Sequence, residues 1–279
     1  MTPDPLVLDP LLRNFLAEDL GHGDVTTEAI FTDEPGRAVL QAREPLVAAG
    51  MAAVAGRIFQ LVGPDTVLAD AMADGQQAAP GDVLLKVAGP ERDILRAERV
   101  ALNLVQRLCG IASLTARYVA AVRPLPVRIC DTRKTTPGLR LLEKYAVRAG
   151  GGHNHRFNLA DGILIKDNHI AACGSIQRAV ELVRTRAPHT LRIEVEADSL
   201  VQVEECLACG VDAILLDNMD PAALRHAVEL VAGRALTEAS GGVTLENVRA
   251  VAETGVDLIS VGRLTHSAPA VDIGLDWEA

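Results

Sequence analysis

Aromatic residues are scarce in this sequence. They make up 3% of its 279 residues, although hydrophobic residues as a whole make up 49%. Few side chains are therefore available to stack on nucleobases. The formal net charge of −10 at pH 7 would also repel a phosphate backbone. Both features argue against a nucleic acid as partner and leave a globular protein with a sizeable core.

The sequence also lacks a disulfide framework and a long apolar run. Its five cysteines are an odd number without framework spacing. Cys206 and Cys209 form a lone C-x-x-C inside VEECLACG, which has the pattern of a helix face rather than of a redox or zinc site. The most apolar stretch, at 45–56, is shorter than the ~20 residues that span a bilayer, and the start resembles no secretory signal. We expect a cytoplasmic protein without a membrane partner.

From residue 127 onward, short runs rich in Val, Ile and Leu alternate with amphipathic stretches. The runs lie at 127–130, 162–165, 191–195, 213–216, 235–237 and 258–261. Gly210, Gly233 and Gly255 follow three of the amphipathic stretches, as C-terminal glycines follow helices. This alternation predicts right-handed βα units and a parallel sheet. Because no dinucleotide fingerprint follows the first run, we expect an α/β fold with an incomplete β/α barrel of about six strands.

The first hundred residues have a different pattern. The segments at 31–50 and 81–90 alternate apolar and polar residues, which predicts half-buried antiparallel strands. A long helix is predicted over 91–122, with an interruption at Gly110. We therefore expect an N-terminal α+β sandwich domain over 1–109, to which the tail 269–279 returns, and a catalytic barrel over 110–268.

Polar residues and glycine turns follow the apolar runs, at the end of a barrel where active sites are built. They are Asp131, Arg133 and Lys134; Lys166, Asp167, Asn168 and His169; Glu194 and Glu196; Asp217 and Asn218; Glu238, Ser240, Gly241 and Gly242; Gly262 and Arg263. Bringing so many charges together costs free energy unless they are paired or bind a ligand. The pattern predicts a binding site at this end of the barrel.

Positive charge gathers between residues 131 and 169. This segment holds 7 Lys or Arg and 4 Asp or Glu, a balance of +3, which leaves −13 for the rest of a chain whose total is −10. We assign Arg140, Lys144 and Arg148 to the solvated face of a helix opened by Thr136 and Pro137. The cations in or beside turns instead suit a small polyanion: Arg133, Lys134, His155, Arg156 and Lys166.

The later barrel units carry carboxylates. Glu196 and Asp217 end neighbouring strands and could accept hydrogen bonds from sugar hydroxyls or share a Mg²⁺ ion. Strand alternation puts Arg192, Glu194 and Glu196 on one face. We expect Arg192 to pair with Glu194 and leave Glu196 for the ligand.

Two consecutive glycine turns predict a phosphate site. Ser240-Gly241-Gly242 precedes a predicted helix, so its backbone N–H groups can point at an anion. Gly262 marks a second turn one unit later, and the last two strands of barrels often build such a site. Taken together, the residues predict an enzyme whose substrates carry carboxylates or pyrophosphate, a polyol and a monophosphate.

Long, ordered motifs in the sequence resemble those of the quinolinate phosphoribosyltransferase family. The motifs are the segment 131–170, EDLGHGDVTT at 18–27, AERVALNL at 97–104, IEVEADSL, ILLDNM and SGGVTLENV, which together extend over essentially the whole chain. The resemblance implies a type II phosphoribosyltransferase fold and a homodimer or a multiple of it, such as a hexamer. It also implies that quinolinate and 5-phosphoribosyl-1-pyrophosphate, with Mg²⁺, give nicotinate mononucleotide, CO₂ and pyrophosphate in NAD biosynthesis.

The resemblance further implies a role for each matching residue. The two carboxylates of quinolinate would be held by Arg133, His155, Arg156 and Lys166. The ribose hydroxyls would contact Glu196 and Asp217, and the 5′-phosphate would contact Ser240, Gly241, Gly242 and Gly262. Lys134 would lie towards the pyrophosphate, which itself would bind most of the Mg²⁺, and Arg99 would enter the neighbouring subunit's site. Catalysis would rest on Lys134, Lys166, Glu196 and Asp217.

Other hypotheses stay open at this point. Lys166 could be the nucleophile of a Schiff-base aldolase, although this leaves the adjacent Arg133 and Lys134 unexplained. The protein could also bind a phosphosugar or a dicarboxylate without turnover, or be a transport-associated relative of the family. His153 and His155 could begin a metal site, but the sequence offers no third ligand nearby.

Overall fold

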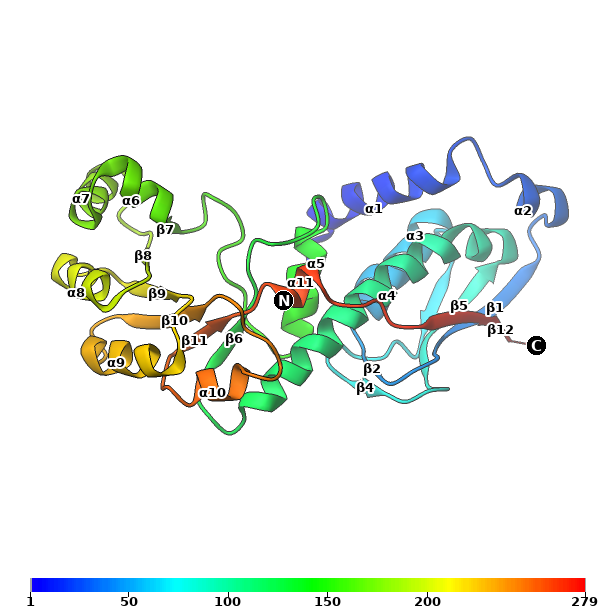
Figure 1. Cartoon of the computed structure of the whole chain (residues 1–279). Helices are drawn as coiled ribbons and strands as arrows, with labels where there is room; N and C mark the ends of the chain where they lie inside the picture. The colour runs from blue at the N-terminus through cyan, green and yellow to red at the C-terminus, as the bar shows by residue number, and fades with distance from the viewer. Residues whose placement is uncertain (1, 279) are drawn as a thin grey trace. The chain divides into compact units, whose positions relative to one another are not determined.

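The computed structural model describes residues 2–278, which divide into two compact units. The first unit comprises the chain up to Ala116, the segment 135–151 and the chain from Leu264. The second unit comprises Arg117–Lys134 and Gly152–Arg263. Figure 1 shows the elements of both units along the chain. No helix within residues 2–278 combines the length and the apolarity needed to cross a membrane.

The first unit is built around a four-stranded antiparallel sheet in the order β12-β1-β5-β3. Its strands and helices are α1 (Pro5–Leu20), α2 (Val25–Ile30), β1 (Pro35–Ala42), β2 (Leu46–Val47), a π-helix (Met51–Gly56), α3 (Arg57–Val62), β3 (Val67–Ala69), β4 (Gln77–Ala78), β5 (Val83–Pro90), most of α4 (Glu91–Val122), α5 (Arg140–Ala149), α11 (Arg263–His266) and β12 (Ile273–Trp277). Strands β1 and β5 pair antiparallel, as their alternating sequences predicted. The C-terminal strand β12 lies at the edge of this sheet against β1 (Figure 1).

Helix α4 runs without a break through Gly110, so the predicted interruption there is wrong. The glycine is needed for close packing instead. A Cβ atom at Gly110 would lie 1.9 Å from the carbonyl oxygen of Pro269. The chain leading to β12 therefore passes directly over the helix, at a distance that only glycine permits.

Helix α5 packs within the first unit, which differs from the assignment of segment 135–151 to the barrel. The fully buried Glu143 accepts hydrogen bonds from the guanidinium of Arg107, and Tyr145 hydrogen-bonds Asp74. The helix begins at Arg140, after the turn at Thr136 and Pro137. The solvated-face assignment is wrong for Lys144, which is 1% exposed and is one of six consecutive buried residues of the helix.

The second unit is an open, six-stranded parallel sheet in the order β6-β11-β10-β9-β8-β7, and it confirms the predicted incomplete barrel. Its elements are β6 (Arg128–Cys130), β7 (Ile163–Ile165), α6 (Asp167–Cys173), α7 (Ile176–Arg186), β8 (Ile193–Ala197), α8 (Leu200–Cys209), β9 (Ala213–Asp217), α9 (Pro221–Val231), β10 (Leu236–Ser240), α10 (Val248–Ala252) and β11 (Leu258–Ser260). The helices α7, α8 and α9 follow one another beside the sheet (Figure 1). All strands point the same way, so their carboxyl ends meet at one edge.

Local sequence signals explain the barrel helices. The hydroxyl of Ser175 caps α7, and Asp220 caps α9 ahead of Pro221. Gly210 ends α8 with a φ of 62°, as the sequence predicted. Cys206 points from α8 into the core, which confirms that the C-x-x-C is part of a helix.

Candidate active site

A cavity of about 540 Å³ lies at the carboxyl ends of the barrel strands. Its walls include the last residues of β9 and β10, Asp217 and Ser240, and the residues that follow β6 and β7. The cavity brings together ten of the predicted site residues: Arg133, Lys134, His155, Arg156, Lys166, Glu196, Asp217, Ser240, Gly241 and Gly242. Cations, carboxylates and a glycine turn therefore share one space.

Two predicted site residues do not line this cavity. Arg99 is exposed on α4, within the first unit. Gly262 is half-buried two residues after the end of β11, but it is not among the lining residues. The roles expected for these two residues stay predictions.

A buried carboxylate holds the cationic loop in place. Asp131 has no exposed surface and accepts hydrogen bonds from the side-chain amide of Asn154 at 2.6 Å and from the backbone N–H of His155 at 2.9 Å. The backbone of His153 pairs with β6 through Ile129 and Asp131. The backbone at His153 therefore lies parallel to the end of β6, and this bridge holds the loop with His155 beside the loop with Arg133.

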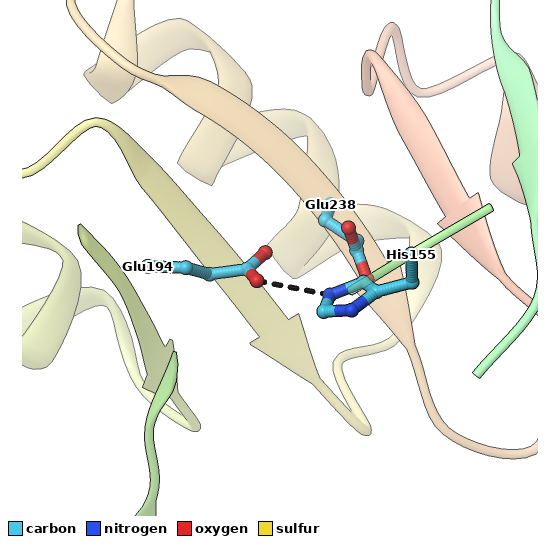
Figure 2. Close-up of side chains that lie close together, drawn as sticks. All are labelled: His155, Glu194 and Glu238. Carbon is cyan, nitrogen blue, oxygen red and sulfur yellow. Dashed lines mark hydrogen bonds and ion pairs between the residues drawn. The ribbon is translucent and has the colours of Figure 1, made fainter. Parts of the chain in front are cut away.

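Hydrogen bonds fix the tautomer of His155. Its Nδ1 accepts from the backbone N–H of Arg156 at 2.8 Å, so this nitrogen carries no proton. The proton of a neutral ring is then on Nε2, which lies 3.0 Å from Oε2 of Glu194 and donates to it. Figure 2 shows Glu194 from β8 pointing at the ring. The predicted pair between Arg192 and Glu194 is wrong, because Glu194 turns into the barrel and bonds His155 instead.

Glu238 completes this cluster. Its carboxylate, 2% exposed, lies 3.5 Å from Nε2 of His155 (Figure 2). It also accepts a hydrogen bond from the hydroxyl of Ser260. Burial raises the pKa of Glu238 to about 7, and the charge of Glu194 adds to this effect. The nearest polar atoms of His155, Glu194 and Glu238 all lie within 4.8 Å of one another, so the three side chains form one cluster. Glu238 was expected at a strand end, but no role was predicted for it.

The wall of the cavity formed by β8 and β9 contains a second group of carboxylates. Glu196 lies 3.6 Å from the ammonium of Lys166. Burial raises the pKa of Glu196, the positive charge of Lys166 lowers it, and the charge of Asp217 raises it. The two carboxylates therefore influence one another across the same corner of the cavity.

The glycine turn after β10 approaches Asn218 closely. Gly241 has a φ of 94°, and a Cβ atom there would lie 2.1 Å from Oδ1 of Asn218. The backbone N–H of Asn218 bonds the carbonyl of Ser240, and its side chain donates to Asp217 at 2.6 Å. Asn218 thus orients both the turn and the carboxylate, a positioning role that its place after β9 did not reveal.

Positive charges face one another on the other side of the cavity. Burial lowers the pKa of Arg156, and the nearby charge of Arg133 lowers it further. Arg156 also donates to the carbonyl of Gly162 at 2.9 Å, which holds its side chain in place. Such a preformed repulsion favours the binding of a carboxylate-rich anion. The features define a β/α-barrel enzyme of small phosphorylated and carboxylated substrates.

The comparisons with known proteins assign this class to a family. Residues 24–109 match the family description "Quinolinate phosphoribosyl transferase, N-terminal domain", and residues 111–276 match the C-terminal domain of the same family. The chain belongs to the quinolinate phosphoribosyl transferase family.

Individual relatives are similar over nearly their full length. A probable nicotinate-nucleotide pyrophosphorylase (carboxylating) of Bacillus subtilis is 47% identical over 97% of this chain and 93% of its own. The nicotinate-nucleotide pyrophosphorylase (carboxylating) of Mycobacterium leprae is 46% identical over 95% of each chain. The crystal structure of NadC from Streptococcus pyogenes, 43% identical, covers 100% of both chains with a TM-score of 0.95.

Proposed function

We propose that this protein transfers the phosphoribosyl group of 5-phosphoribosyl-1-pyrophosphate to quinolinate and releases nicotinate mononucleotide, CO₂ and pyrophosphate. Family membership and the names of the full-length relatives support the reaction. One observation carries it at the level of the site: a single cavity is lined by turn cations, by two strand-end carboxylates and by a glycine turn. These three groups match the dicarboxylate, the ribose and the phosphate of the two substrates.

Quinolinate binds on the cationic side. Its two carboxylates relieve the repulsion between Arg133 and Arg156, while Lys166 and His155 complete the pocket. Nicotinate has one carboxylate fewer and would leave part of this charge uncompensated. The protein should therefore prefer quinolinate strongly.

The phosphoribosyl group binds on the opposite side. Glu196 and Asp217 accept hydrogen bonds from the ribose hydroxyls, and the backbone N–H groups of Gly241 and Gly242 receive the 5′-phosphate. As pyrophosphate leaves, positive charge develops at the anomeric carbon, and these carboxylates stabilise it. Lys134, exposed at the rim of the cavity, compensates the charge of the leaving group.

Mg²⁺ belongs to the proposal as the partner of the pyrophosphate. The residues fit such an ion, because Glu196 and Asp217 make one corner of the cavity electronegative. The pyrophosphate oxygens would bind the ion directly, and the two carboxylates would accept hydrogen bonds from its water ligands. When bound, the ion neutralises charge on the leaving group.

The functional unit that we propose is a homodimer or a multiple of it. Arg99 is exposed on α4, so it is available to a second copy of the chain. There it would add a further cation to the quinolinate side of the neighbouring site. We place the protein in the cytoplasm, because both substrates are highly charged metabolites that do not cross membranes unaided.

A product assay with two acids tests the reaction. Protein, 5-phosphoribosyl-1-pyrophosphate and Mg²⁺ are incubated with either quinolinate or nicotinate, and mononucleotide formation is followed. We expect product with quinolinate only. Product with nicotinate alone would overturn the substrate assignment and leave the family intact.

Two other functions, a Schiff-base aldolase and a non-catalytic binder, predict results that differ from those of the transferase. The side chain of Lys166 forms an ion pair with Glu196 at 3.6 Å, and the proposed reaction uses this lysine to bind a carboxylate and not as a nucleophile. Borohydride should therefore trap no carbonyl substrate on Lys166. A binder would take up quinolinate in the presence of Mg²⁺ and 5-phosphoribosyl-1-pyrophosphate without releasing pyrophosphate.

A further inference from the structure

The cluster of His155, Glu194 and Glu238 lies between two cavities of the barrel. The upper cavity is the substrate site, and both His155 and Glu238 line it. A second cavity of about 540 Å³ touches all three residues from the other side. Its wall includes the first residues of five strands: Arg128, Ile163, Ala213, Leu236 and Leu258. It therefore opens at the amino ends of the strands, away from the substrates.

The charges around Glu238 decide which group of the cluster takes a proton. Glu194 on β8 accepts a hydrogen bond from the Nε2–H of His155 and lies close to the positive charge of Arg156. Glu238 on β10 faces the charge of Glu194, together with the Ser260 hydroxyl on β11 and the Cys130 thiol on β6. It is 2% exposed, and burial of a second carboxylate beside Glu194 favours its protonated form.

We infer that Glu238 is the acid of the decarboxylation step, with Glu194 and His155 as its positioning residues. The carboxyl group takes up a proton as the dianionic acid enters the upper cavity and donates this proton after CO₂ has left. This inference rests on the proposed function. It adds a catalytic residue that the sequence did not assign.

The chemical step balances without a further reactant. The bond between the ring carbon next to the new nitrogen–ribose bond and its carboxylate breaks, and CO₂ leaves. The electron pair stays on the ring carbon, next to the positive ring nitrogen that stabilises it. The Glu238 carboxyl then gives its proton to this carbon and becomes a carboxylate. Glu238 takes up its next proton from solvent when another dianionic acid enters the upper cavity.

The pH dependence of quinolinate binding tests the uptake of the proton. Quinolinate affinity is measured by calorimetry between pH 6 and 9, in buffers of different ionisation enthalpy and with a chelator that removes divalent metal ions. Above pH 7, we expect the affinity to fall by up to tenfold per pH unit, with uptake of up to one proton. The change Glu238→Gln fixes a neutral side chain, so the slope and the proton uptake should both disappear.

A matched control and a second readout separate this role from a structural one. Glu204→Gln removes an exposed carboxylate on α8 and should keep the slope of the unmodified protein. In a single turnover, Glu238→Gln should lower the rate of mononucleotide formation relative to pyrophosphate release at least tenfold. The melting curves of both variants establish that they are folded.

Three outcomes are distinguishable. A Glu238→Gln protein that keeps the pH slope of binding, or forms mononucleotide as fast as it releases pyrophosphate, overturns the inference. If Glu238→Gln does not fold, Glu194→Gln takes its place: without the negative neighbour, Glu238 loses its proton more easily, so the fall in affinity should begin at a lower pH, and an unchanged profile overturns the inference. An unmodified protein that binds no quinolinate contradicts the proposed function itself.

Discussion

Replacing Asp131 by alanine should weaken the binding of quinolinate much more than the binding of 5-phosphoribosyl-1-pyrophosphate. The carboxylate is fully buried and accepts hydrogen bonds from Asn154 and from the backbone N–H of His155. Leaving a buried donor unsatisfied costs about 1–3 kcal/mol, and this cost falls on the N–H of His155, because Asn154 is exposed and its amide can turn to water. The loop that carries His155 and Arg156 would shift or admit water to recover these bonds.

The expected effect is a selective loss of binding. In Asp131→Ala, quinolinate affinity should fall at least tenfold, because the cations of the loop are displaced. Affinity for 5-phosphoribosyl-1-pyrophosphate should change less than threefold, since Ser240, Gly241 and Gly242 follow a different strand. Calorimetry with each substrate measures both, and urea unfolding measures the stability.

The conservative variant Asp131→Asn provides the control. It keeps one acceptor for the N–H of His155, and the amide of Asn154 can rotate to present its oxygen to the new side chain. It should retain most of the stability and of the quinolinate affinity. If Asp131→Ala loses affinity for both substrates equally, or for neither, Asp131 does not hold this loop in place.

Three further substitutions test other parts of the account. Arg133→Ala should abolish turnover with quinolinate while the thermal melting curve stays unchanged, and near-normal activity would contradict its role. Gly241→Ala should raise the KM for 5-phosphoribosyl-1-pyrophosphate at least tenfold, because the new methyl group meets Asn218 and the backbone has a φ of 94°; an unchanged KM would show that this turn does not bind the phosphate. Gly110→Ala should lower the unfolding free energy by about 1–3 kcal/mol or more, since its Cβ would meet the Pro269 carbonyl at 1.9 Å. Urea denaturation checks this loss, and unaltered stability would mean that the chain does not pass so close to α4.

Much of the barrel could be predicted from the sequence because its signals are local. Each strand is a short apolar run between turn residues, and the helices carry their own caps, such as Ser175 and Asp220. Parallel strands put their carboxyl ends at one edge, so the residues that follow them meet without any knowledge of the packing. This rule brought together ten of the expected site residues.

The remaining features depend on contacts between distant segments. Gly110 looked like a helix break, but its reason is the chain at Pro269, more than 150 residues away. Lys144 has the spacing of a solvated helix residue, yet the helix is buried on almost every side. Glu194 was expected to pair with Arg192 on its own strand. Its partner is His155 instead, from a loop beside β6 at the other end of the strand order. Local patterns contain no information on such encounters.

The most direct test of the central claim follows the two leaving groups together. Quinolinate labelled in the carboxylate next to the ring nitrogen is incubated with 5-phosphoribosyl-1-pyrophosphate, Mg²⁺ and the protein, and labelled CO₂ and pyrophosphate are measured. The account predicts that both are released in equal amounts and that neither appears without the other substrate. Pyrophosphate released without CO₂ at completion, or no release of either, would contradict it.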